Sequence, residues 1–312
     1  MTTMSSQPKA LITGATGFVG SRLSHHLARQ GWSVTALVRP GAKLDQLQPT
    51  KPPGIQTLPL EGNAEALAAQ VRSVKPDVVI HLASVYLAQH KPTEIAAMMQ
   101  ANLTFGTELL DAMSAAGVTR FVNAGTGWQH FDNAPYRPVN LYAATKQAFE
   151  DILAYYCDAH AMSAITLKIF DSYGPSDPRP KLIFALMRAA KQQTPLELSP
   201  GEQQLELVHI DDICNAFTLA AERTATMPPA AHERYALTAA RRVTLRQLVE
   251  EMKAALNIDI PVKFGAKPYR PREVMVPWSQ GDRLPGWAPQ VPFVEGIRAC
   301  YDAFLDSSAE HP

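Results

Sequence analysis

A tyrosine and a lysine stand four residues apart in the segment YAATK at residues 142–146. Residues with this spacing share one face of a helix, so the phenol of Tyr142 and the ammonium of Lys146 can point into one site. A free tyrosine has a pKa of about 10, too high for efficient proton transfer near neutral pH. A neighbouring ammonium, together with the positively charged ring of a cofactor bound beside it, would favour the phenolate and bring that pKa into range. The pair therefore predicts a proton-transfer site in which Tyr142 exchanges the proton.

A threonine hydroxyl lies ahead of this pair, at Thr126 in the turn AGTG (124–127). The turn follows an apolar run at 120–124 that predicts a strand. A hydroxyl at the carboxyl edge of a parallel sheet is well placed to hydrogen-bond a substrate carbonyl beside the tyrosine. Thr126 is therefore predicted to lie in the same site as Tyr142 and Lys146. The alternative is that Thr126 only forms a turn between glycines.

A glycine-rich turn near the start of the chain, TGATGFVG (13–20), links a predicted strand to a predicted helix. Glycines at 14, 17 and 20 allow a tight turn, a close backbone approach to a pyrophosphate and close packing of helix on strand. The helix N-terminus offers free N–H groups and a partial positive charge to phosphates. Because this turn lies in the first strand–helix unit of an alternating chain, it predicts a dinucleotide site rather than a plain turn.

The residue after the second predicted strand bears on the choice of dinucleotide. An NAD site usually places an acid there for the ribose hydroxyls, whereas a cation accommodates a 2′-phosphate. Here the strand runs into Arg39, and no acid follows until Asp45. We therefore predict NADP(H) as the cofactor, with NAD(H) less favoured. The alternative is a solvated arginine at a strand end.

Short apolar runs alternate with amphipathic stretches through the first half of the chain. The runs are nearly unbroken, as in strands buried on both faces of a parallel sheet, and lie at 9–13, 33–38, 55–60, 77–82, 120–124 and 164–170. Helices are predicted between them at 20–30, 64–74, 93–116 and 140–159. Strand–helix alternation with short connections predicts an α/β fold with a doubly wound parallel sheet.

The pattern changes after about residue 174. Residues 1–174 carry 10 prolines and residues 175–312 carry 15. Because proline removes a backbone donor and resists regular elements, the second half is predicted to be rich in loops, with helices at 181–193, 211–223, 245–256 and 293–305. We expect residues 1–174 to bind the dinucleotide, with a later contribution from about 203–225. Residues 175–312 are expected to form mainly a smaller α/β cap that binds substrate.

The charge balance and the cysteines argue against several classes of function. Lys and Arg number 29, as do Asp and Glu, and a net charge of zero argues against a nucleic-acid-binding protein. Three scattered cysteines cannot form a disulfide framework or a CxxC metal site, so no metal is predicted. The first residues lack the apolar segment of a signal peptide, and no run of about 18 apolar residues occurs, so we expect a cytoplasmic protein without membrane contact.

These motifs together resemble the extended short-chain dehydrogenase/reductase family, the NAD-dependent epimerases, dehydratases and reductases of NDP-sugars. The matching stretches follow family order: TGATGFVG (13–20), HLAS (81–84), NLT (102–104), Thr126, YAATK (142–146), YGP (173–175) and VHIDD (208–212). The resemblance implies a Rossmann domain, an NDP-sugar partner and a homodimer paired through the helices at 93–116 and 140–159. It implies Thr126, Tyr142 and Lys146 as the catalytic set, with Tyr142 as the proton donor or acceptor. It also implies cofactor contacts at Gly14, Thr16, Gly17, Phe18, Val19, Asn63, Leu82, Ala83, Tyr142 and Lys146.

The loop after Thr126 bears on the reaction. Dehydratases and decarboxylases of the family carry acidic residues there, whereas this chain has GWQH (127–130), so dehydration is disfavoured. Arg39 favours exchangeable NADPH and net reduction, and the segment 170–181 resembles reductases of the CDP-abequose and paratose synthase type. We therefore expect NADPH-dependent reduction of the C4 ketone of an NDP-4-keto-6-deoxyhexose. The alternatives are an NDP-sugar 4-epimerase with bound NAD and a non-catalytic NADP-binding regulatory protein.

An NDP-sugar brings a diphosphate, so cations must converge on it. The candidates are Arg179 and Lys181 after the YGP segment, and Arg270 and Arg272 in YRPRE (269–273), a region where the resemblance implies that an arginine contacts the diphosphate. The alternative for each cation is a solvent-facing loop position. Asn123 and Gln129 are predicted to hydrogen-bond sugar hydroxyls.

Overall fold

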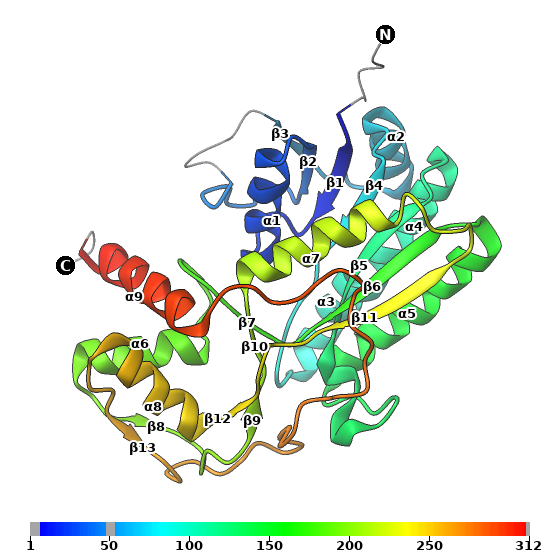
Figure 1. Cartoon of the computed structure of the whole chain (residues 1–312). Helices are drawn as coiled ribbons and strands as arrows, with labels where there is room; N and C mark the ends of the chain where they lie inside the picture. The colour runs from blue at the N-terminus through cyan, green and yellow to red at the C-terminus, as the bar shows by residue number, and fades with distance from the viewer. Residues whose placement is uncertain (1–6, 48–53, 310–312) are drawn as a thin grey trace.

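Seven parallel strands form the central sheet of the computed structural model, which describes residues 7–47 and 54–309 (Figure 1). They are β1 (Lys9–Thr13), β2 (Ser33–Val38), β3 (Ile55–Pro59), β4 (Val78–His81), β5 (Arg120–Thr126), β6 (Ser163–Ile169) and β11 (His232–Leu237). Across the sheet the order is β11–β6–β5–β4–β1–β2–β3. The order reverses beside β1, which pairs with β2 on one edge and β4 on the other, and ligands of such sheets bind at this switch point. The predicted doubly wound α/β fold is confirmed.

Helices cover both faces of the sheet. On one face, α1 (Phe18–Arg29) and α7 (Ile210–Arg223) share a buried apolar cluster with Ala10 and Ile12 of β1. On the other, α2 (Ala64–Val74), α4 (Phe105–Ala116) and α5 (Leu141–His160) share a cluster with Leu11. Successive residues of a strand point to opposite faces, so burial of both faces explains the unbroken apolar runs in the sequence.

The helix predicted at 93–116 is interrupted. It begins with a 3-10 turn, η1 (Pro92–Glu94), and continues as α3 (Ile95–Met99), a π-helical turn η2 (Gln100–Thr104) and α4. Single π turns inside α-helices are frequent at functional sites. The side chain of Asn102 in η2 is buried and forms hydrogen bonds to the backbone of Val85 and to Thr145 of α5.

A second group of elements has its own apolar core, which includes Leu186, Leu248, Met252 and Ile297. It comprises α6 (Leu182–Gln192), α8 (Leu245–Leu256), α9 (Phe293–Ala309) and the strand pairs β8 (Leu196–Glu197) with β13 (Val262–Lys263) and β9 (Gln204–Leu205) with β12 (Val243–Thr244). These elements lie at the lower left of Figure 1. The parallel pair β7 (Asp171–Tyr173) and β10 (Leu207–His209) lies between them and the large sheet.

The edge strand β11 is absent from the sequence prediction. Only its last two residues are buried, and it begins with the polar run His232, Glu233 and Arg234. An edge strand pairs on one side only, so it needs no continuous apolar run, and the run-based signal fails there. The chain therefore returns to the sheet after α7 before it builds the rest of the second core.

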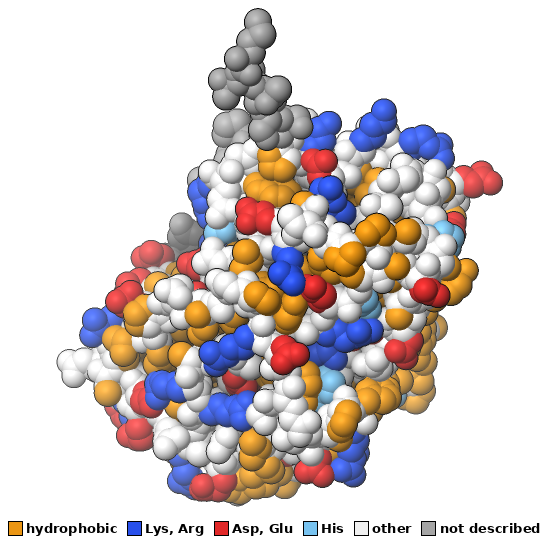
Figure 2. Space-filling view, turned by 45° about the vertical axis from the view of Figure 1, so that its right-hand side comes forward, with side chains coloured by type: hydrophobic (Ala, Val, Ile, Leu, Met, Phe, Trp, Pro, Cys, Tyr) orange, Lys and Arg blue, Asp and Glu red, His pale blue; other side chains and the backbone are white. Residues whose placement is uncertain are grey.

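Charges of both signs are interspersed over the face shown in Figure 2, in keeping with the net charge of zero. No helix within the described ranges has both the length and the apolar character needed to cross a membrane. Residues 7–47 and 54–309 also contain no group of three or more His, Cys, Asp or Glu that could hold a metal ion.

Candidate active site

Thr126, Tyr142 and Lys146 line one cavity of about 230 Å³ at the carboxyl edge of the sheet. Thr126 is the last residue of β5, and the other two lie in the first two turns of α5. Asn140 caps this helix, because its side chain accepts a hydrogen bond of 2.9 Å from the Ala143 N–H. The cap fixes where α5 begins and hence the direction in which Tyr142 and Lys146 project.

The glycine turn forms another wall of the same cavity, which Gly14, Gly17, Phe18, Val19 and Leu82 also line. Gly14 has φ +69°, and a Cβ there would lie 2.6 Å from the Ala83 nitrogen. The N-cap of α1, Gly17, makes no side-chain capping bond, so the first N–H groups of α1 are available to an anion. This cradle fits the pyrophosphate of a dinucleotide. Thr16 lies in the same turn but, like Ala83, is outside the cavity lining.

Arg39 and Asn63 lie farther along the sheet edge and outside this cavity. The guanidinium of Arg39 is exposed at the end of β2 and forms no ion pair within the described residues. The amide of Asn63 caps α2, because its Oδ1 accepts a hydrogen bond of 2.8 Å from the Ala66 N–H. Arg39 is thus free to meet a phosphate, whereas the Asn63 oxygen already has a structural partner.

Burial shifts the pKa values of both Tyr142 and Lys146. Burial, and then the neighbouring Tyr86, raise the pKa of Tyr142 to about 12, although a hydrogen bond with Ser84 and the charge of Arg179 act in the opposite direction. Burial lowers the pKa of Lys146 to about 8, while the carboxylate of Glu150 raises it. In the protein without a dinucleotide, desolvation of the phenolate outweighs the favourable charges, and Tyr142 holds its proton at neutral pH.

A buried asparagine ties two walls of the cavity together. The Oδ1 of Asn102 accepts hydrogen bonds from the Val85 N–H at 2.7 Å and from the Ser84 hydroxyl at 3.2 Å. Its Nδ2 donates to the Thr145 hydroxyl of α5 at 2.9 Å. The π turn that presents Asn102 therefore locks the loop after β4 against the helix that carries Tyr142 and Lys146.

A larger cleft of about 580 Å³ continues from this cavity and shares the wall residues Tyr86, Trp128, Phe170, Asp171, Ser172 and Lys181. Lys181, Arg270 and Arg272 line it, so three of the predicted diphosphate cations meet there. Arg270 is held by Glu273 at 2.9 Å, and its guanidinium carbon lies 5.9 Å from the Trp128 ring centroid. The cleft shares a wall with the cavity that Tyr142 lines, and it is lined by cations.

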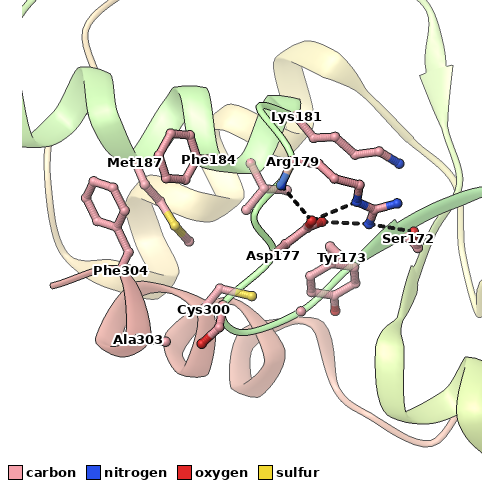
Figure 3. A pocket seen from close by; sticks show the side chains of 13 residues that line it. Ser172, Tyr173, Asp177, Arg179, Lys181, Phe184, Met187, Cys300, Ala303 and Phe304 are labelled. Carbon is pink, nitrogen blue, oxygen red and sulfur yellow. Dashed lines mark hydrogen bonds and ion pairs between the residues drawn. The ribbon is translucent and has the colours of Figure 1, made fainter. Parts of the chain in front are cut away.

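Arg179 stands between the two groups of elements (Figure 3). Asp177 holds its guanidinium by two bonds, of 2.7 Å and 2.6 Å, and the Ser172 hydroxyl accepts a third of 3.0 Å. The guanidinium carbon lies 4.5 Å from the ring centroid of Phe18, the first residue of α1. Arg179 therefore contacts the glycine-turn side of the site. In Figure 3, Lys181 extends in the same direction, away from Met187 and Phe304.

Two predicted sugar contacts, Asn123 and Gln129, are not brought to the cavity or the cleft. Both side chains have no exposed surface. The Asn123 amide donates to the Thr166 hydroxyl at 3.2 Å, inside the sheet. Gln129 turns beneath the Thr126 loop, where its Oε1 accepts a hydrogen bond of 2.9 Å from the Thr126 N–H. Both side chains are therefore buried away from the space that a substrate could enter.

Two residues of the site were missed at the sequence level, Tyr86 and Asp171. Tyr86 is half-exposed and follows the HLAS segment, and Asp171 follows the strand β6 in the run FDSYGP. The position of Asp171 directly after a strand was the available signal. The loop after Thr126 has no acid before Asp132, which pairs with Arg137 at the surface. Asp171 nevertheless brings a carboxylate to the wall shared by the cavity and the cleft. The sequence argument against an acid considered only the loop after Thr126 and therefore did not include this residue.

Comparison with known proteins agrees with this geometry. The model of the NAD dependent epimerase/dehydratase family matches residues 10–233, more than half of the chain. This chain belongs to that family, as its motifs predicted.

Two relatives and one solved structure match nearly the full chain. The CDP-abequose synthase of Salmonella muenchen is 24% identical over 294 residues, covering 93% of this chain and 96% of that protein. The UDP-glucose 4-epimerase of Mycolicibacterium smegmatis is 23% identical over 324 residues, covering 96% and 99%. A structure of UDP-glucose 4-epimerase from Stenotrophomonas maltophila, with bound NAD and formylated UDP-arabinopyranose, superposes with a TM-score of 0.85 at 17% identity, covering 97% and 100%. That structural likeness establishes the fold.

Proposed function

We propose that this protein reduces the C4 ketone of an NDP-4-keto-6-deoxyhexose with NADPH. The observation that carries the proposal is one cavity that joins the glycine turn to Thr126, Tyr142 and Lys146, with no acid in the loop directly after Thr126. The similarity to a CDP-abequose synthase over nearly the whole chain supports a reductase over a dehydratase.

In the proposed reaction, bound NADPH supplies a hydride to C4 of the sugar. Thr126 donates a hydrogen bond to the ketone oxygen and polarises it. Tyr142, which holds its proton because burial raises its pKa to about 12, donates that proton to the new alkoxide. Lys146 binds the nicotinamide ribose, and its positive charge stabilises the phenolate that remains on Tyr142.

We propose that the elements of residues 1–174 bind NADP(H), with the later contribution from about 203–225, and that residues 175–312 mainly bind substrate. Arg39, exposed and without an ion pair in the described residues, supports NADP(H) through a 2′-phosphate contact. Lys181 and Arg270 line the cleft and Arg179 borders the cavity, which supports a diphosphate site there.

We also propose a homodimer that pairs through α4 and α5. The outer side of α5 carries Tyr155, which is 61% exposed. An exposed aromatic on a long helix supports an interface. Size-exclusion chromatography with light scattering tests this: a mass of one chain at micromolar concentration would contradict the dimer.

A 4-epimerase with bound NAD is the second candidate, because the relative from Mycolicibacterium smegmatis and the matched solved structure are both 4-epimerases. The two functions differ in cofactor balance. A reductase consumes one NADPH for each 4-keto sugar, which absorbance at the reduced nicotinamide band measures. Interconversion of two hexose nucleotides without net NADPH loss would establish the epimerase. Tight NADP binding without either reaction would establish the regulatory protein.

A further inference from the structure

A fully buried carboxylate, Glu150, lies one helical turn beyond Lys146 on α5. Acidic side chains without exposed surface are rare unless they are paired and hydrogen-bonded, because an ionised carboxylate loses its hydration on burial. Glu150 lines neither the cavity nor the cleft. It lies behind the wall that Thr126 and Lys146 form, so substrate cannot use it directly.

One oxygen of Glu150 orients the loop of Thr126. Its Oε1 accepts a hydrogen bond of 2.7 Å from the Nε2 of Gln129. A carboxylate only accepts, so this bond forces the amide nitrogen of Gln129 toward Glu150 and the amide oxygen to the other side. There the Gln129 Oε1 accepts the Thr126 N–H at 2.9 Å. Glu150 therefore reaches the backbone of the proposed carbonyl-binding residue through one intermediary.

The other oxygen of Glu150 faces two cations. Lys168 of β6 lies 3.7 Å away and Arg234 of β11 lies 3.4 Å away. The Lys168 ammonium donates to the Nε2 of His130 at 2.7 Å, which fits a neutral imidazole, since burial and Lys168 lower the pKa of His130 to about 4. The His130 ring stacks on Trp278, a residue of the cleft wall, with centroids 3.6 Å apart. This buried cluster supports the cleft wall from behind.

The same carboxylate acts on Lys146 by charge. Burial lowers the pKa of the Lys146 ammonium, and Glu150 raises it. The two histidines on the neighbouring strands are uncharged at neutral pH, because burial lowers the pKa of His81 on β4 and of His232 on β11 to about 3. On α5 itself, Tyr142 keeps its proton because its pKa is raised to about 12. Lys168 and Arg234 weaken the effect of Glu150, since they neutralise part of its charge.

We propose that Glu150 is a positioning residue of the active site, which aims the Thr126 loop through Gln129 and keeps Lys146 charged during turnover. This proposal rests on the proposed roles of Thr126 and Lys146. It adds two interactions that those roles do not require: the hydrogen bonds from Glu150 through Gln129 to Thr126, and the charge interaction between Glu150 and Lys146. The structural alternative is that Glu150 only balances Lys168 and Arg234 in the core.

Glu150→Gln separates these readings, because it keeps the shape of the side chain and removes its charge. We expect kcat at pH 8 to fall roughly 10-fold, with less than about a 3-fold change in the KM for NADPH. The alkaline limb of the kcat profile should move about one pH unit lower, since Lys146 loses its negative neighbour. Lys168→Met removes a cation that pairs with Glu150 and keeps the carboxylate. More of the negative charge of Glu150 then acts on Lys146, so the alkaline limb of the kcat profile should stay in place or move to higher pH. Asp158→Asn, an exposed carboxylate on the same helix, should change nothing.

A direct titration makes the test independent of turnover. Lysines are methylated with ¹³C-formaldehyde, and the NMR resonance of Lys146 is assigned by its absence in Lys146→Arg. A pKa about one unit lower in Glu150→Gln than in wild type supports the proposal. If Glu150→Gln folds poorly, Glu150→Gln/Lys168→Met, which removes one charge of each sign, must show the same lower pKa. An unchanged Lys146 pKa, or equal activity losses in Glu150→Gln and Lys168→Met, overturns the positioning role. A wild-type protein that fails to oxidise NADPH with 4-keto sugars speaks against the proposed function instead.

Discussion

The ring of Tyr86 meets the ring of Tyr142 edge to face, with centroids 5.1 Å apart and planes at 83°. Trp128 continues the contact at 5.7 Å from Tyr86. Tyr86 is half-exposed on the wall shared by cavity and cleft, so it stands between the phenol of Tyr142 and water. This shielding keeps the pKa of Tyr142 high and its proton in place until a substrate oxygen arrives.

Tyr86 should therefore act through its ring. Tyr86→Phe keeps the ring and is expected to change kcat/KM less than about 3-fold, whereas Tyr86→Ala removes an aromatic contact of about 0.5–1.5 kcal/mol, admits water and should lower kcat/KM roughly 10-fold. Steady-state kinetics on both variants measure this. Equal losses in the two variants would assign the role to the hydroxyl of Tyr86 instead.

Tyr142→Phe should remove the proton donor without removing the cofactor site. We expect kcat to fall at least about 100-fold, in line with the loss of general acid catalysis, while the Kd for NADPH stays within a few-fold. Fluorescence titration measures the binding. Tyr155→Phe, at an exposed position of the same helix, is the matched control and should keep full activity. Undiminished turnover in Tyr142→Phe would refute the catalytic assignment.

The pH dependence should carry the signature of Lys146. Burial lowers its pKa from 10.5 to about 8, so the charge that stabilises the phenolate of Tyr142 disappears, and kcat falls, as pH rises through about 8. Stability should change in the opposite sense, because between about 8 and 10.5 the unfolded chain binds more protons than the folded one, and the contribution of Lys146 to the free energy of unfolding rises with pH.

Lys146→Arg tests this assignment, since a guanidinium stays charged throughout and should flatten the alkaline limb. Urea melts at pH 7.5 and 9.5 check that activity is not lost by unfolding. An alkaline limb that persists unchanged in Lys146→Arg would belong to another group.

Gly14 should be intolerant of any side chain. Its φ of +69° and the 2.6 Å approach to the Ala83 backbone leave no space for a Cβ, so Gly14→Ala is expected to destabilise the protein by about 1–3 kcal/mol and weaken dinucleotide binding at least about 10-fold. Gly62→Ala is the control, because nothing lies within 4 Å of a Cβ there. Thermal melts with and without NADPH measure both effects, and a cofactor affinity equal to wild type in Gly14→Ala would contradict the cradle.

Arg39 should set the preference between the two dinucleotides. Arg39→Ser removes the cation proposed for the 2′-phosphate and should reduce the ratio of kcat/KM for NADPH over NADH roughly 10-fold, mainly through the KM for NADPH. Lys43→Ser, which removes a cation from the same loop, is the comparison. If the ratio in Arg39→Ser equals that of wild type, another group selects the cofactor.

The sequence predicted six of the seven strands of the large sheet and the common placement of Tyr142 and Lys146, for a physical reason. Strands buried on both faces must be continuously apolar, and α2 and α8 begin and end at the residues the pattern predicts. Helical spacing alone placed Tyr142 and Lys146 on one side of α5. The edge strand β11 was not predicted, because its partial exposure allows it to begin with polar residues.

The directions of amide side chains could not be predicted in the same way. Asn123 and Gln129 are close to Thr126 in sequence, yet both turn into the protein, because Thr166 and Glu150 offer buried partners from strands and helices distant in the chain. Asp171 enters the site only because β7 pairs with β10, a contact across 36 residues. Such partners depend on tertiary contacts, which periodicity does not encode.

The π turn at Gln100–Thr104 also constrains how this chain can vary in length. A π turn closes its hydrogen bonds over five residues where an α-helix closes them over four, so a one-residue deletion in this turn would restore regular helix between α3 and α4 and remove the bulge that presents Asn102. Asn102 would then leave either the loop after β4 or Thr145. The number of residues between Pro92 and Phe105 should therefore be fixed. We expect substitutions of the exposed residues in this segment to be tolerated, whereas insertions and deletions should not be.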